Sequence, residues 1–159
     1  MVERAVGERY VLHHVTLSVR DIYKTADFYA VFGFKLVLRW VDSDDSLAIA
    51  HFARKDGFIL EMFQYGRNGG RSRPELEVGN DLEDLGVKHI AFKVSDIRAA
   101  RTELLAIECG ELTEIQLGRT GVEYFFVADP DGNWVEILQD DRSPRARHLS
   151  AAASGGSRR

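Results

Sequence analysis

The sequence predicts an α+β fold made of two tandem copies of one βαβββ module. The first observation is an internal repeat, because at an offset of 75 residues the segment HVTLSVRDI from His14 overlays HIAFKVSDI from His89 without a gap. The same offset places KDGFILEMFQ, residues 55–64, on PDGNWVEILQ, residues 130–139. The second observation is that both copies begin with a strand-like alternation of apolar and polar residues, followed by a short amphipathic segment. Two matching blocks in one register indicate a duplicated module.

The first copy contains signals for one helix and four strands. Residues 11–19 alternate with the period of a half-buried strand. Asp21 suits the N-cap of a helix that runs to about Phe32, with Gly33 suited to the position that ends it. Asp56-Gly57 is typical of a type I′ hairpin turn. Three strands are expected after the helix, near 34–41, 46–54 and 58–65.

The second copy repeats this order. We expect a helix over 96–107, capped by Ser95 or Asp96 and ended by Gly110. Its strands are expected near 88–94, 111–117, 121–128 and 133–139. The resulting organisation is a single domain over 10–141, with module one at 10–65, a linker at 66–86, module two at 87–141, an N-terminal extension at 1–9 and a disordered tail at 142–159.

Composition excludes several classes of function. The net charge of −4 argues against nucleic-acid binding, which needs a concentrated basic face. Cys109 is the only cysteine, so the chain forms no internal disulfide and no thiolate metal cluster. No apolar run approaches the length of a membrane span, and the first ten residues lack the apolar stretch of a signal peptide. We therefore expect a cytoplasmic protein.

The first and last strands of each copy carry a polar residue among apolar neighbours. Successive side chains of a strand point to opposite faces, so the apolar residues face the helix and the polar residue faces away from it. This places His14 and Glu61 of the first copy, and His89 and Glu136 of the second, on the face opposite the helix. Both His-to-Glu separations are 47 residues.

These four side chains have the chemistry of a metal site. Two imidazoles and two carboxylates suit a borderline divalent ion, and the candidates are Zn²⁺, Ni²⁺, Co²⁺, Fe²⁺ and Mn²⁺. The carboxylates also balance the charge of the ion, which offsets the cost of burying them. We therefore expect His14, Glu61, His89 and Glu136 to bind one divalent metal ion. His51 overlays Phe126 and is expected to be a pocket or core residue.

Four motifs resemble those of a known family. They are H-V-x-L-x-V-x-D at 14–21, L-E-M-F at 60–63, G-V-K-H-I-A-F at 86–92 and D-P-D-G-N-W-V-E at 129–136. With the duplicated βαβββ module, they resemble the vicinal oxygen chelate superfamily, which includes glyoxalase I, methylmalonyl-CoA epimerase, extradiol dioxygenases, and fosfomycin and bleomycin resistance proteins. The resemblance implies a half-barrel sheet around the metal site and a homodimer.

Within this family the donor set is most similar to that of bacterial glyoxalase I. Methylmalonyl-CoA epimerases usually carry Gln at the position of Glu61. The resemblance implies a lyase or isomerase in which the metal acts as a Lewis acid on a small molecule and Glu61 or Glu136 transfers a proton next to a carbonyl. Glyoxalase I usually holds glutathione with an Arg and an Asn where this chain has Ser18 and Tyr65, so another α-oxygenated compound can be the substrate.

Two alternatives stay open. An extradiol-type Fe(II) dioxygenase would use the triad His14, His89 and Glu136, although Glu61 would then occupy a position needed for the diol or O₂. A non-catalytic small-molecule (antibiotic) binding protein would line its pocket with aromatic side chains, most of which we expect in the core instead. These aromatic residues are Trp40, Phe63, Tyr65, Tyr124, Phe125 and Trp134.

Overall fold

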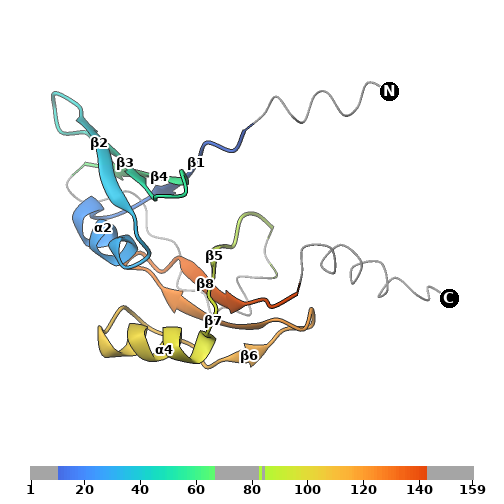
Figure 1. The fold of residues 1–159 in the computed structure, drawn as a ribbon. Helices are drawn as coiled ribbons and strands as arrows, with labels where there is room; N and C mark the ends of the chain where they lie inside the picture. The colour runs from blue at the N-terminus through green and yellow to red at the C-terminus, as the bar shows by residue number, and fades with distance from the viewer. Residues whose placement is uncertain (1–10, 67–82, 84, 143–159) are drawn as a thin grey trace, which may run out of the picture. The chain divides into compact units, whose positions relative to one another are not determined.

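The computed structural model describes residues 11–66, 83 and 85–142, which belong to two compact units. The first unit contains the first module and also the turn Asp129–Gly132. The second contains the rest of the chain from Val78 onwards. The expected extension at 1–9, nearly all of the linker at 66–86 and the tail after residue 142 lie outside the described residues. Each unit has a four-stranded mixed sheet with a helix packed on it (Figure 1).

The first unit confirms the predicted order of elements. Its sheet runs β1-β4-β3-β2, with β1 parallel to β4 and the other neighbours antiparallel. The helix α2 contacts β2 and β4. The elements are β1 (His14–Ser18), α2 (Ile22–Ala30), β2 (Lys35–Val41), β3 (Leu47–Ala53) and β4 (Ile59–Tyr65).

The second unit has the same topology, with its sheet in the order β5-β8-β7-β6. The strand register repeats as well: His14 pairs with Ile59 between β1 and β4, and His89 pairs with Trp134 between β5 and β8. In the described part of the chain, no helix is long and apolar enough to cross a membrane. The elements are β5 (His89–Lys93), α4 (Ile97–Ala106), β6 (Gln116–Leu117), β7 (Glu123–Ala128) and β8 (Trp134–Gln139).

Each helix begins in the same way. The Asp21 carboxylate accepts hydrogen bonds from the backbone N–H groups of Tyr23 and Lys24, over 2.9 and 3.2 Å. Gln64, at the end of β4, accepts the N–H of Ile22 over 2.9 Å. These side chains satisfy N–H groups that have no partner within the helix. The bonds repeat in the second unit, where Asp96 is the N-cap of α4 and Gln139 accepts the N–H of Ile97 over 3.0 Å.

The core of each unit lies between the helix and one face of its sheet. Alternate residues of β4 and β8 are buried, as the strand pattern predicts. Burial of these apolar side chains is the main stabilising contribution to each unit. The residues that are at most 3% exposed include Val19, Ile22, Tyr29, Phe34, Leu60 and Met62 in the first unit and Ile97, Phe125, Val127, Val135 and Ile137 in the second.

The Asp56-Gly57 turn forms the expected hairpin, but the predicted turn type is wrong. Gly57 N–H donates to the Arg54 carbonyl oxygen over 3.0 Å, and Arg54 N–H donates to the Phe58 carbonyl oxygen over 3.0 Å. Gly57 has a φ of +87°, whereas Asp56 keeps a negative φ. A type I′ turn requires a positive φ at both central residues. The loop is therefore a three-residue hairpin in which only the glycine adopts the left-handed conformation.

The strand expected at 111–117 is mostly irregular. β6 contains only Gln116–Leu117, and Leu112 forms an isolated bridge with Val127. The pairing with β7 slips by one residue between these two points. Thr113 lies in between, and its Oγ1 accepts the Phe126 N–H over 2.9 Å. The Thr113 side chain therefore replaces part of the backbone hydrogen-bond ladder. The alternation of apolar and polar residues in the sequence does not reveal this replacement.

The turn between β7 and β8 packs with α2 in the first unit. The Tyr29 hydroxyl donates to Asp129 Oδ2 over 3.2 Å, and the Thr25 hydroxyl donates to Asp131 Oδ2 over 3.1 Å. Tyr29, Thr25 and Asp129 are all buried. Burial first, and then the neighbouring Asp129 carboxylate, raise the pKa of Tyr29 far above its usual value. The phenol therefore remains protonated and continues to donate this bond.

The helix caps lead to a stability prediction. Asp21→Ala should lower the free energy of unfolding by about 0.5–2 kcal/mol, because two N–H groups of α2 lose their acceptor. Asp27→Ala is the matched control, since it removes the same charge from an exposed site within the same helix. The control should change the free energy by less than about 0.5 kcal/mol. Urea denaturation measures both, and equal effects would contradict the capping role of Asp21.

Candidate metal centre

The first predicted donor pair comes together in the first unit. Parallel pairing places Thr16 beside Glu61, so His14 lies two residues earlier on the same face of the sheet. His14 Nε2 is 3.4 Å from Glu61 Oε2. The Glu61 side chain is only 14% exposed, which is low for a carboxylate. The face opposite α2 therefore presents an imidazole and a carboxylate side by side.

The second predicted pair comes together in the same way in the second unit. His89 Nε2 is 3.2 Å from Glu136 Oε2, and the Glu136 side chain is 18% exposed. The Phe126 ring packs against the His89 ring, with centroids 5.3 Å apart. His89 Nδ1 is buried and has no hydrogen-bond partner in the described part of the chain. In both units, therefore, the histidine and the glutamate of the repeated pair are in contact.

The atom separations within each pair fit two ligands of one ion. Ligands about 2.1 Å from a metal, at angles of about 90–109°, lie about 3.0–3.4 Å from each other. The two His–Glu separations, 3.4 and 3.2 Å, agree with this range. Within residues 11–66, 83 and 85–142, no three or more His, Cys, Asp or Glu side chains are grouped to hold a metal ion. The structure therefore presents the predicted four donors as one pair in each unit.

Two further residues contact Glu61 and were not among the predicted site residues. The Thr16 hydroxyl donates to Glu61 Oε2 over 2.7 Å, and His51 Nε2 is 2.8 Å from Glu61 Oε1. His51 faces Glu61 because the two residues are direct partners in the β3–β4 ladder. The Asp56-Gly57 hairpin was only a partial signal, because a two-residue turn would bring position 51 opposite position 62. The three-residue loop of the structure brings it opposite position 61 instead.

The surroundings of Glu61 alter its acidity. Burial raises the pKa of the carboxyl group, and hydrogen bonds from Thr16 and His51 lower it. The imidazoles of His14 and His51 lower it further, and the net result is a pKa below the usual value. The ionised form of Glu61 is therefore favoured, which is the form that binds a cation.

Most of the aromatic residues expected in the core lie on the sheet faces that carry these pairs. Phe125 is fully buried, but Trp40 and Tyr65 are about half exposed, at 48% and 49%. Strand register explains the error, because alternate positions of β4 and β8 face away from the helix. The expectation is therefore wrong for the exposed Trp40 and Tyr65, whereas Phe63, Tyr124 and Trp134 are half-buried. Of the six, those that share a face with Glu61 or Glu136 are Trp40, Phe63, Tyr65, Tyr124 and Trp134.

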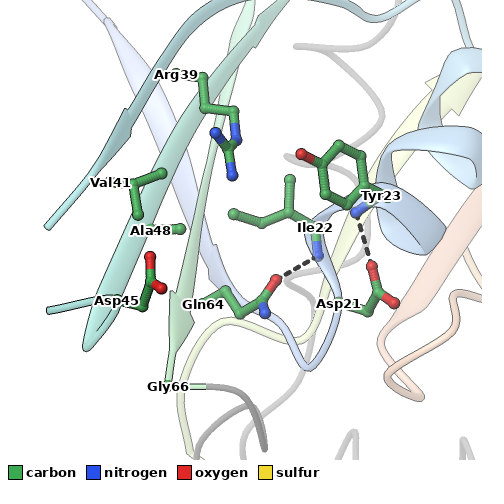
Figure 2. Close-up of a pocket in the computed structure, with 9 residues that line it drawn as sticks. All are labelled: Asp21, Ile22, Tyr23, Arg39, Val41, Asp45, Ala48, Gln64 and Gly66. Carbon is green, nitrogen blue, oxygen red and sulfur yellow. Dashed lines mark hydrogen bonds between the residues drawn. The ribbon is translucent and has the colours of Figure 1, made fainter. Parts of the chain in front are cut away.

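A pocket of about 260 Å³ opens elsewhere in the first unit, where α2 begins (Figure 2). Gln64 contributes to it and lies on the opposite face of β4 from Glu61, so the pocket is separate from the His–Glu pair. At the repeat-related positions of Tyr23 and Ala48, the second unit has Arg98 and Glu123, which form a two-bond ion pair. The lining residues are Asp21, Ile22, Tyr23, Arg39, Val41, Asp45, Ala48, Gln64 and Gly66.

Known proteins resemble this chain in sequence. Lactoylglutathione lyase of Pseudomonas aeruginosa is 28% identical over 152 residues, which cover 85% of this chain and 85% of that enzyme. A family model described as Glyoxalase/Bleomycin resistance protein/Dioxygenase superfamily matches residues 11–137. The match includes both His–Glu pairs.

Solved structures share the fold. A glyoxalase family protein from Enterococcus faecalis aligns with a TM-score of 0.67 and 25% identity, over 80% of this chain and 96% of that one. A fosfomycin resistance protein from Listeria monocytogenes, crystallised with Mn(II) and a dihydroxypropylphosphonic acid, aligns with a TM-score of 0.60 and 20% identity. The latter alignment covers 87% of this chain and 97% of that one.

The duplicated βαβββ module, the repeated His–Glu pairs and the family match lead to one conclusion. The resemblance inferred from the motifs is confirmed: this chain belongs to the Glyoxalase/Bleomycin resistance protein/Dioxygenase superfamily.

Proposed function

We propose that this protein is a divalent-metal-dependent enzyme of the glyoxalase type, a lyase or isomerase that moves a proton next to a carbonyl group of a small molecule. The observation that carries the proposal is the duplicated His–Glu pair on the sheet face away from the helix. The His Nε2 and Glu Oε2 atoms are 3.4 Å apart in the first copy and 3.2 Å apart in the second. The lactoylglutathione lyase relative supports the reaction class.

One metal ion would be held by His14, Glu61, His89 and Glu136, with all four ligands from one chain or with two chains of a homodimer contributing. Ni²⁺, Co²⁺, Zn²⁺, Fe²⁺ and Mn²⁺ all accept this mixture of imidazole and carboxylate. The fosfomycin resistance protein of the same fold was crystallised with Mn(II), which is one of these ions. When bound, the ion would supply Lewis-acid polarisation of the substrate oxygens.

The protein's own contribution to the reaction is a pair of carboxylates. Glu61 or Glu136 would remove the proton from the carbon next to the carbonyl, and the other carboxylate would return it. Both side chains are mostly shielded from solvent, at 14% and 18% exposure, and shielding strengthens their electrostatic effect on a nearby charge.

The substrate would be an α-oxygenated small molecule that need not contain glutathione, because Ser18 and Tyr65 replace the residues that usually hold it. The exposed aromatic side chains on the face of Glu61, such as Trp40 and Tyr65, would contact its apolar part. We further propose that the protein works in the cytoplasm, where its lone Cys109 remains reduced.

Substitution of each glutamate tests the reaction. Glu61→Gln and Glu136→Gln keep an oxygen donor but remove the base, so at least one of them should lower turnover about 10²–10⁴-fold. Turnover would be measured with a panel of thiohemiacetals and α-hydroxy ketones, together with exchange of the substrate proton for solvent deuterium. Metal content would be measured on the same samples, and we expect it to be retained.

The control separates loss of chemistry from loss of folding. Glu123→Gln removes a carboxylate from the same sheet as Glu136 but outside the His–Glu pairs, where it bonds Arg98, and it should leave turnover unchanged. Full activity of both Glu61→Gln and Glu136→Gln would contradict the proposed proton transfer.

The alternative is an Fe(II) extradiol-type dioxygenase. The observation in its favour is that both oxygens of Glu61 already have partners, Thr16 and His51, which leaves His14, His89 and Glu136 as a two-His, one-carboxylate set. Stoichiometric oxygen uptake with a catechol in the presence of Fe²⁺ would establish this alternative. Under our proposal, no catechol-dependent uptake occurs.

A further inference from the structure

The carboxylate of Glu61 is bracketed by side chains from the strands on either side. Thr16, on β1, donates its hydroxyl hydrogen to Oε2 over 2.7 Å. His51, on β3, places Nε2 2.8 Å from Oε1. Both residues are direct ladder partners of Glu61, so backbone pairing sets their approach. Rotation of the carboxylate would break both contacts at once.

The repeat-related glutamate lacks both contacts, although its backbone surroundings are the same. The positions that correspond to Thr16 and His51 are Ala91 and Phe126, which pair with Glu136 in the equivalent register. Neither side chain carries a hydrogen-bond donor. Within the described residues, Glu136 Oε2 lies 3.2 Å from His89 Nε2. The two copies therefore differ: Glu61 contacts Thr16 and His51, whereas Ala91 and Phe126 offer no such contact to Glu136.

We propose that His51 and Thr16 are positioning residues that hold the Glu61 carboxylate in one orientation, so that Glu61 and Glu136 are not interchangeable. A Glu61 carboxylate that is already oriented should bind a metal ion more strongly. This consequence rests on the proposed function, in which Glu61 is a metal ligand. His51 engages Oε1, whereas Oε2 accepts the Thr16 hydroxyl and also faces His14, 3.4 Å from its Nε2. A carboxylate oxygen has a second lone pair beside one hydrogen bond, so Glu61 would offer Oε2 as its metal donor.

The contact itself can be tested in metal-free protein. An ionised carboxylate only accepts hydrogen bonds, so His51 must carry its proton on Nε2. Long-range ¹H–¹⁵N spectra of the histidine rings should show a protonated His51 Nε2 that shifts when Glu61→Leu is introduced. Glu136→Leu is the matched control and should shift the His89 signals while leaving those of His51 in place.

The consequence can be tested by titrating Co²⁺ into metal-free protein, with calorimetry for affinity and visible absorption for coordination. His51→Leu removes the donor and should weaken Co²⁺ binding about 10–100-fold, as expected for loss of a group that orients a ligand. His51→Gln restores an N–H donor and should remain within about threefold of the unsubstituted protein. Thr16→Val and Thr16→Ser form a second pair with the same expected contrast.

Several outcomes would overturn the proposal. One is a His51 Nε2 that is unprotonated or insensitive to Glu61→Leu. Another is unchanged Co²⁺ affinity in both His51→Leu and Thr16→Val. Complete loss of Co²⁺ binding in His51→Leu, as severe as in His14→Ala, would make His51 a ligand instead. If the unsubstituted protein bound no Co²⁺, the proposed function would fail, and the ¹⁵N spectra alone would decide whether His51 orients Glu61.

Discussion

Parallel pairing between the first and last strands of each module underlies both the core and the candidate site. It joins segments 47 residues apart and brings His14 next to Glu61 on one face of the sheet. The other face of the same strands is buried under α2, so a slip of one residue would move the histidine and the glutamate into the core. Gln64 helps to hold this register, because its side chain ties the end of β4 to the first turn of α2.

The residues that are identical in both copies have separable roles. Asp21 and Gln64, with their counterparts in the second unit, satisfy the first N–H groups of a helix. Gly57 allows the hairpin to turn, because it adopts a positive φ. The His–Glu pair neither caps a helix nor forms a turn in either copy. Its side chains lie on the sheet face away from the helix, which is the basis of the metal site that we propose.

Sequence patterns were sufficient for the modules and for the pairing of each His with its Glu, because both follow from alternation and a constant offset. Side-chain chemistry was sufficient for the cap Asp21, whereas the choice between Ser95 and Asp96 needed the structure. Sequence patterns were not sufficient for the irregular segment around Thr113, where a side chain replaces part of the strand ladder. The aromatic residues were misplaced because hydrophobicity alone does not distinguish a core position from an exposed one such as Trp40. The contact between His51 and Glu61 was missed because it depends on the register across a hairpin, which a repeat offset does not contain.

We propose that one His–Glu pair from each copy binds the same metal ion. Metal content per chain, measured by mass spectrometry after dialysis against a mixture of divalent ions, is the direct test. We expect one equivalent of metal for the unsubstituted protein and nearly complete loss in His14→Ala and also in His89→Ala, with folding unchanged. Retention of the full equivalent in either variant, or absence of bound metal from the unsubstituted protein, would rule out a shared metal site.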